Sequence, residues 1–206
     1  MDLLLFALIA GAFLVLKKRD QSARIRLLGS ALSRYDIEKL MESLTDGYLR
    51  ALAEEDAERQ SQVWSFLATQ EVKLAEQFST FATEFAREET VRTRVSRLPF
   101  AVPYAAVLFP AATFDLRRAF AIHAKGLAGL LENPGQIDPK RKAFTVSAEL
   151  FLMQHTCHWF CRSKAVASAR LLARHKTPYA QVLGAVLPAT RASYEALIGN
   201  SRDVSR

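Results

Sequence analysis

Apolar side chains recur at steps of three and four residues along most of the chain, which is the spacing of one face of an α-helix. Ile37, Leu40 and Leu44 show this spacing. Asn133-Pro134-Gly135 is typical of a turn between two such segments. The helices that the pattern predicts cover residues 21–33, 36–53, 114–132, 139–176 and 179–198, with the last one interrupted or kinked near Pro188. The sequence therefore predicts an all-α fold, in which an N-terminal helix is followed by a bundle of about five or six helices.

Residues 54–96 contain neither Gly nor Pro, and they carry an apolar seam with heptad-like spacing. A two-stranded coiled coil favours Leu with Val or Ile at such positions, whereas three Phe suit the wider core of a bundle. The pattern favours packing within the chain, with an oligomerising coil as the alternative. The seam positions are Leu67, Glu71, Leu74, Phe78, Phe81 and Phe85.

Residues 3–16 contain no charged side chain and no Pro, and Lys17, Lys18 and Arg19 follow directly. A cleaved signal peptide normally carries its positive charge before the apolar run. The run is shorter than the roughly 20 residues of a usual span, so a buried core helix is an alternative. We expect residues 1–19 to form a membrane anchor, as a single span or an inserted helix. Residues 20–206 then form one helical domain.

The anchor's orientation follows from charge, because basic residues beside a membrane segment stay on the cytoplasmic side. Lys17, Lys18 and Arg19 would lie at the membrane interface, where long basic side chains reach the headgroups. The body of the protein is therefore expected to face the cytoplasm. Two cysteines, Cys157 and Cys161, fit a reducing compartment better than the cysteine-dense framework of a small secreted domain.

Residues 98–113 form a nearly uncharged stretch that contains Pro99, Pro103 and Pro110. Proline removes backbone donors and disfavours helix at the preceding residue, so a continuous helix is not expected here. One interpretation is a buried connector that crosses the bundle. The other is a loop or broken helix at the membrane surface, which must stay shallow because irregular backbone is excluded from deep hydrocarbon.

Charge is distributed unevenly along the chain, although the net charge is only +7. Residues 36–89 carry thirteen acidic and five basic side chains, whereas residues 134–206 carry eleven basic and four acidic ones. For residues 134–206, the basic third of the chain, the favoured interpretation is that the basic side chains are solvated or contact the acidic segment at 36–89. Anionic lipid is the alternative, and nucleic acid is disfavoured because no turn precedes a recognition helix and aromatic residues are not interleaved. One basic cluster comprises Arg162, Lys164, Arg170, Arg174, His175 and Lys176.

The densest group of potential metal ligands is His155, Cys157, His158 and Cys161. One straight helix cannot wrap four ligands around an ion, and the spacing differs from that of zinc sites. The two cysteines fall on an apolar stripe, so packing is favoured, with metal or cofactor binding as the alternative. His123 also lies on an apolar stripe, where a hydrogen-bonded core histidine is expected. We therefore expect no bound cofactor.

The sequence contains no nucleophile elbow, no phosphate-binding glycine loop and no zinc-protease motif. An enzymatic role is left open but is not favoured. The favoured function is a membrane-tethered helical scaffold or accessory subunit, with a protein partner or a second copy of the chain. The alternatives are a metal- or cofactor-binding protein that uses residues 155–161, and a module that binds anionic lipid or nucleic acid through the basic third.

Overall fold

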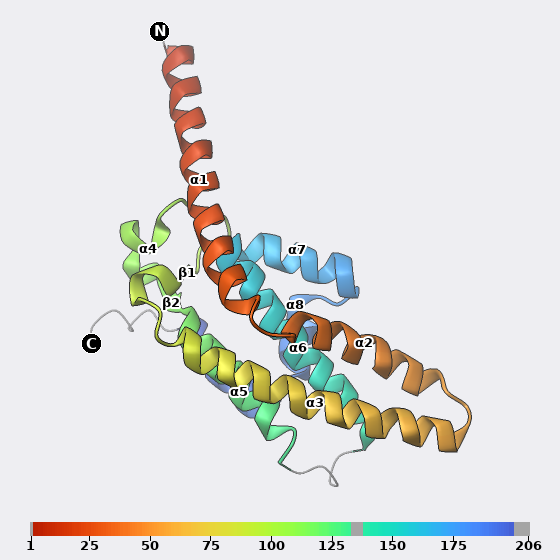
Figure 1. The fold of residues 1–206 in the computed structure, drawn as a ribbon. Coiled ribbons are helices and arrows are strands. Elements are labelled where there is room, and N and C mark those ends of the chain that lie inside the picture. The colour runs from red at the N-terminus through yellow and green to blue at the C-terminus, as the bar shows by residue number, and fades with distance from the viewer. Residues whose placement is uncertain (1, 133–137, 200–206) are drawn as a thin grey trace.

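The computed structural model describes residues 2–132 and 138–199, and the helices in these ranges number nine (Figure 1). The prediction of an all-α fold is confirmed, with more and shorter helices than expected. The predicted turn at Asn133-Pro134-Gly135 lies outside the described residues. The helices are α1 (Asp2–Leu32), α2 (Ile37–Ala53), α3 (Ala57–Phe85), α4 (Ala105–Leu108), α5 (Leu116–Gly129), α6 (Pro139–Cys161), α7 (Lys164–His175), α8 (Tyr179–Ala185) and α9 (Pro188–Gly199).

Helix α6 lies at the centre of the body and packs against α1, α2, α5, α7 and α8. Asp138 caps its first turn by accepting a hydrogen bond from the Arg141 N–H, and Pro139 occupies the position that needs no donor. Because neighbours surround α6, its buried side chains include both large apolar groups and polar ones such as Glu149, His155 and Thr156. The core of the protein is therefore built around this helix.

A short antiparallel ribbon, which the sequence did not predict, joins the ends of α3 and α5. Strand β1 (Arg94–Ser96) pairs with β2 (Thr113–Asp115), with Val95 opposite Phe114. Two 3-10 turns flank the ribbon, η1 (Thr90–Thr93) and η2 (Pro110–Ala112). Trp159 of α6 ties the ribbon to the core, because its indole N–H donates to the Ser96 carbonyl oxygen at 2.7 Å. The segment that contains α4 lies between β1 and β2, so the ribbon holds both of its ends against the body.

The predicted seam of α3 is buried within the chain, which confirms a bundle of helices in one chain. Phe78, Phe81 and Phe85 contact Phe120 of α5, and the ring centroids of Phe81 and Phe120 are 5.1 Å apart. Tyr35, between α1 and α2, packs edge-on against Phe81. This aromatic cluster holds α3 to α5 and closes the body beneath α1.

The seam's acidic member, Glu71, is buried with two partners from other helices. The Tyr48 hydroxyl of α2 donates to one carboxylate oxygen of Glu71 at 2.7 Å. The Lys142 ammonium of α6 lies 2.5 Å from the other oxygen. Burial raises the pKa of the Tyr48 hydroxyl well above its ordinary value, so the phenol keeps its proton. The three side chains therefore join α2, α3 and α6 through a buried ion pair.

Two predicted helix boundaries were wrong. The expected helices at 1–19 and 21–33 are one unbroken helix, α1, because nothing between Lys17 and Gln21 interrupts the helical backbone. The expected helix over 139–176 ends at Cys161, and α7 begins at Lys164. Ser163 makes this break: its backbone is extended and its hydroxyl accepts from the Val166 N–H, which caps the new helix.

Phe81→Ala should lower the free energy of unfolding by about 3–5 kcal/mol, because it leaves a cavity among Phe78, Phe85 and Phe120. Denaturant unfolding of purified full-length protein measures this loss. Phe66→Ala is the matched control on the same helix, because that ring is 58% exposed. Equal effects of the two substitutions would contradict the assigned core.

Lys142→Met should destabilise the body by about 3–5 kcal/mol, because the Glu71 carboxylate would stay buried without its cation. Lys73→Met is the control: Lys73 pairs with Asp36 at 3.7 Å, but both side chains are more than half exposed. Exposed pairs contribute only about 0–1 kcal/mol. A thermal unfolding shift of the same size in both variants would argue against a buried pair.

Candidate functional site

The N-terminal half of α1 projects beyond the body, and its apolar side chains are exposed on every face (Figure 1). Leu3 is 83% exposed and Phe6 is 70% exposed, whereas Leu28, farther along the same helix, is 3% exposed. Uniformly apolar exposed helix is costly in water, since each large side chain gains about 1.5–3 kcal/mol on burial. This half of α1 is the first candidate functional site.

The second half of α1 is fastened to the body by polar contacts. The Arg24 guanidinium donates to the Arg94 carbonyl oxygen at 2.9 Å and lies over the Phe160 ring. Arg162 donates to the Gln21 side-chain oxygen at 2.6 Å. Because α1 is continuous, these contacts fix the direction in which its apolar half leaves the body.

The predicted single span is not supported: within residues 2–132 and 138–199, no helix combines the length and the apolar character needed to cross a membrane. The uncharged run is fourteen residues, from Leu3 to Leu16. At 1.5 Å per residue it measures about 21 Å, against about 30 Å of bilayer hydrocarbon. Lys17, Lys18 and Arg19 close the run at the side nearest the body.

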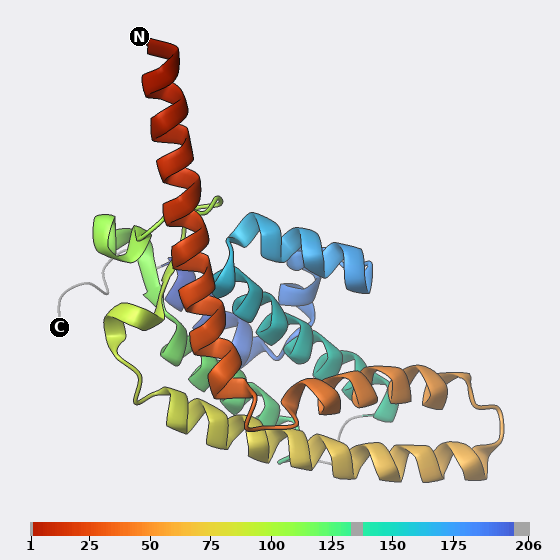
Figure 2. The same ribbon diagram turned by 45° about the horizontal axis from the view of Figure 1, so that its top comes forward.

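The 98–113 segment is not a buried connector, contrary to the first of its two interpretations. Pro103 and Ala105 point inward, but most of the large apolar side chains face outward. The segment lies beside the part of α1 that leaves the body, where Tyr104 and Val107 share a cavity with Asp20 and Ala23 (Figures 1 and 2). It forms a second exposed apolar region on the same side of the body. The exposed members are Phe100, Tyr104, Val107, Leu108 and Phe109.

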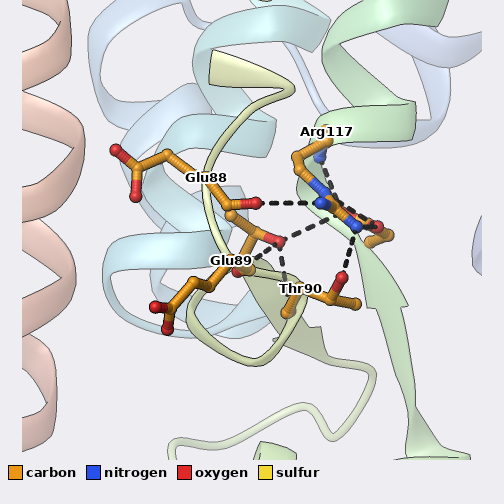
Figure 3. A network of polar contacts seen from close by, with 6 residues as sticks. Glu88, Glu89, Thr90 and Arg117 are labelled. Carbon is orange, nitrogen blue, oxygen red and sulfur yellow. Dashed lines mark hydrogen bonds and ion pairs between the residues drawn. The ribbon is translucent and has the colours of Figure 1, made fainter.

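Figure 3 shows the polar network that holds the base of this segment, centred on Arg117 of α5. Arg117 donates to the Glu88 carbonyl oxygen at 2.9 Å and to the Thr90 hydroxyl at 2.8 Å. Its guanidinium also pairs with Asp115 at 2.6 Å, and the hydrogen bond to Asp115 raises the pKa of Arg117. The Thr93 hydroxyl donates to the same carboxylate at 3.2 Å. The network joins the end of α3 to the start of α5.

The four residues predicted as possible metal ligands do not converge on one point. His155 faces α7 and α8, where its ring nitrogen lies 3.1 Å from the Ser168 hydroxyl and the ring stacks on Tyr179. Cys157, His158 and Cys161 instead line a cavity of about 210 Å³ against α1 and α2. Among the residues that the structure describes, no three His, Cys, Asp or Glu are placed to hold a metal ion.

The electrostatics of these residues favour packing over chemistry. Burial raises the pKa of the Cys161 thiol to about 11, and burial also raises that of Cys157. A thiol that keeps its proton is a poor nucleophile and a poor metal ligand. Burial lowers the pKa of His155 to about 3, so its ring is neutral. Both cysteines pack against the hydrophobic core.

Four members of the cluster at 162–176 contact different parts of the described body. Arg162 contacts Gln21 of α1, and Lys164 lies over the rings of Trp159 and Tyr179. Arg174 lies 3.8 Å from Glu42 of α2 and so contacts the acidic segment, as the favoured interpretation expected. His175 contacts the Gln154 side-chain oxygen at 2.8 Å.

A groove of about 580 Å³, which the sequence did not predict, separates α2 from α6, α7 and α8. Leu49, Phe144 and Phe151 are among the apolar residues that line it. Glu42 and Arg174, at its rim, form the ion pair that links α2 to α7. The exposed ring of Phe144 makes this groove a candidate surface for a partner.

A buried polar layer between α5, α6 and α9 was also missed, except for His123. The His123 ring contacts the Thr156 hydroxyl at 3.0 Å, as expected for a hydrogen-bonded core histidine. Thr156 also contacts the Tyr194 hydroxyl at 2.9 Å. Burial lowers the pKa of His123 to about 3. The layer therefore joins three helices through neutral groups.

Glu149 lies beside this layer and accepts a hydrogen bond from the Leu187 N–H at 3.0 Å. Burial raises the pKa of Glu149 to about 7, although the Thr190 hydroxyl and the Leu187 N–H act in the opposite direction. Gly126 of α5 makes room for this carboxyl: a Cβ there would lie 2.8 Å from a Glu149 oxygen and 2.5 Å from the Thr190 hydroxyl. Glu149 is the only Asp, Glu, Lys or Arg in residues 143–161, a signal that could have identified it.

No protein-family model, no curated protein and no solved structure matches this chain. The function is therefore argued from the geometry of the site alone.

Glu149→Gln should stabilise the protein more at pH 8 than at pH 5, by roughly 2–3 kcal/mol. The ordinary glutamate pKa of about 4.3 applies to the unfolded chain. Between that value and about 7, the folded state holds more protons than the unfolded state, so stability from this group falls as pH rises. Glutamine cannot ionise, and its carbonyl can still accept from Leu187. Unfolding in denaturant at both pH values gives the difference.

Glu195→Gln is the control for this experiment, because Glu195 is exposed on α9 and pairs with Arg191 on the same helix. Comparing each variant with wild type removes the contributions of the buried histidines, which lose stability at acid pH in all three proteins. A Glu149→Gln effect that is equal at pH 5 and pH 8 would show that this carboxyl is ionised in the folded state.

Proposed function

We propose that this chain is a membrane-attached helical scaffold, in which the apolar half of α1 inserts into a bilayer and the remaining helices form a docking body. The observation that carries the proposal is the exposure of the Leu3–Leu16 run on all faces of a helix that projects from the body. An inserted helix buries this surface without crossing the membrane. The run is about 21 Å long, which is more than the roughly 15 Å of hydrocarbon in one leaflet but less than the roughly 30 Å of both. It can therefore enter the hydrocarbon without spanning it.

The basic cluster at residues 17–19 supports one orientation on the membrane. Lys17, Lys18 and Arg19 follow the apolar run at the point where α1 approaches the body, so they would lie among the headgroups. Basic residues beside an inserted helix stay on the cytoplasmic side. The body is therefore proposed to lie on the cytoplasmic face of the membrane.

The scaffold role is supported by how the body uses its polar side chains. His123 contacts Thr156 of α6, Glu149 contacts the backbone before α9 and His155 contacts Ser168 of α7, so these side chains serve packing between elements. The groove between α2 and α6–α8 leaves the aromatic ring of Phe144 exposed to a partner. A body of this kind is suited to hold another protein near the membrane.

Ile9→Asp should weaken the attachment of full-length protein to vesicles by about a hundredfold, because an acidic side chain at the centre of an inserted helix costs about 2.5–3.5 kcal/mol. Vesicle flotation measures the bound fraction as a function of lipid concentration. The melting temperature of the body should not change, because the Ile9 side chain is 61% exposed.

Leu49→Asp is the matched control, since Leu49 is equally exposed but lies on α2 of the body. It should bind vesicles as wild type does. The proposal fails if wild-type protein does not float with vesicles, or if Ile9→Asp binds as tightly as Leu49→Asp.

A further inference from the structure

The 98–113 segment stands at the point where α1 leaves the body. Tyr104 and Val107 line a cavity of about 180 Å³ together with Asp20, Ala23 and Leu27 of α1. These α1 residues lie within about two helical turns of the basic cluster at 17–19, on its body side, so the segment stands next to the proposed headgroup region (Figure 2). No charged residue occurs from Leu98 to Phe114. Its outward side chains would therefore meet a membrane that α1 had entered.

The backbone of this segment is suited to a surface with little water. The N–H groups of Val107 and Leu108 bond the Tyr104 carbonyl oxygen, at 2.9 and 3.1 Å, and that of Phe109 bonds the Ala105 carbonyl oxygen at 2.8 Å. Pro103 and Pro110, on either side, carry no N–H. Apolar environments tolerate irregular backbone only where such groups are internally satisfied. The turn around α4 meets this condition with its own hydrogen bonds.

The outward position of the segment is held by the rest of the fold. The β1–β2 ribbon and the Arg117 network fix its two ends (Figure 3). Tyr104 has a φ of 55°, in the left-handed region that costs a non-glycine residue of order 1 kcal/mol or more. Such a conformation persists where the surrounding structure holds it. Here it starts α4 with Val107 and Leu108 facing outward.

We propose that the 98–113 segment is a second membrane contact, which enters the headgroup region of an anionic bilayer and fixes the body in one orientation. The proposal rests on the proposed insertion of α1, and it commits to the membrane surface as the occupant. Three observations favour lipid: the segment's place within about two helical turns of the basic cluster, the hydrogen bonds inside its α4 turn, and the absence of charge from Leu98 to Phe114. One helix alone would leave the body free to rotate about its axis, whereas two contacts fix that rotation.

Amide hydrogen exchange of full-length protein, measured without lipid or detergent and on vesicles of phosphatidylcholine and phosphatidylglycerol, tests this contact. Exchange at residues 104–109 should slow by about tenfold or more on vesicles, because a solvent-exposed single turn opens readily in water. In Phe109→Asp this protection should be lost, while protection of residues 3–16 remains. In the matched Phe66→Asp, a change on the distant exposed face of α3, both protections should remain.

The outcomes separate this inference from the proposed function. Protection of residues 3–16 without protection of 104–109 overturns the second contact and leaves insertion of α1 standing. Protein that does not bind the vesicles overturns both. Protection of 104–109 that rises with protein concentration without vesicles indicates a second copy as the occupant and overturns the inference. If Phe66→Asp also loses the protection of residues 104–109, that protection does not depend on contact of this segment with the membrane, and the inference is overturned.

Discussion

The fold depends on one constraint: α6 is surrounded by other helices, so each polar side chain buried on it needs a partner from a neighbour. Each partner comes from a different element. Lys142 meets Glu71 of α3, Glu149 meets the backbone before α9, and His155 meets Ser168 of α7. Trp159 bonds the β1 strand. These contacts fix how α3, α7, β1 and the segment before α9 are placed against one central helix, which apolar packing alone would specify less closely.

The two halves of helix α1 lie in different surroundings. Its second half carries the arginine and glutamine contacts that tie it to β1 and to Arg162. Its first half has side chains that no part of the described body covers. The helix is unbroken between them, so the body and whatever surrounds the apolar half are joined by a rigid element. The same orientation brings the 98–113 segment to that side of the molecule.

Periodicity predicted much of this from the sequence. The Phe seam of α3 was placed correctly, because spacing along one helix decides which side chains share a face. The break at Ser163 was missed, because its cap depends on a local hydrogen bond that propensity does not specify. For the 98–113 segment the sequence favoured a buried connector over an exposed loop, and only the structure decides for the exposed one. Its outward direction is set by the β1–β2 ribbon and by Arg117, contacts between residues far apart in the sequence.

The aromatic seam has a consequence for the order in which the chain is made. Phe78, Phe81 and Phe85 leave the ribosome well before Phe120, the ring that covers them. Until α5 emerges, the nascent chain carries an uncovered aromatic face on α3 as well as the apolar half of α1. The incomplete chain then exposes two apolar surfaces at once, and such exposed surface promotes aggregation. Early capture of α1 would leave only the aromatic face for a chaperone to shield.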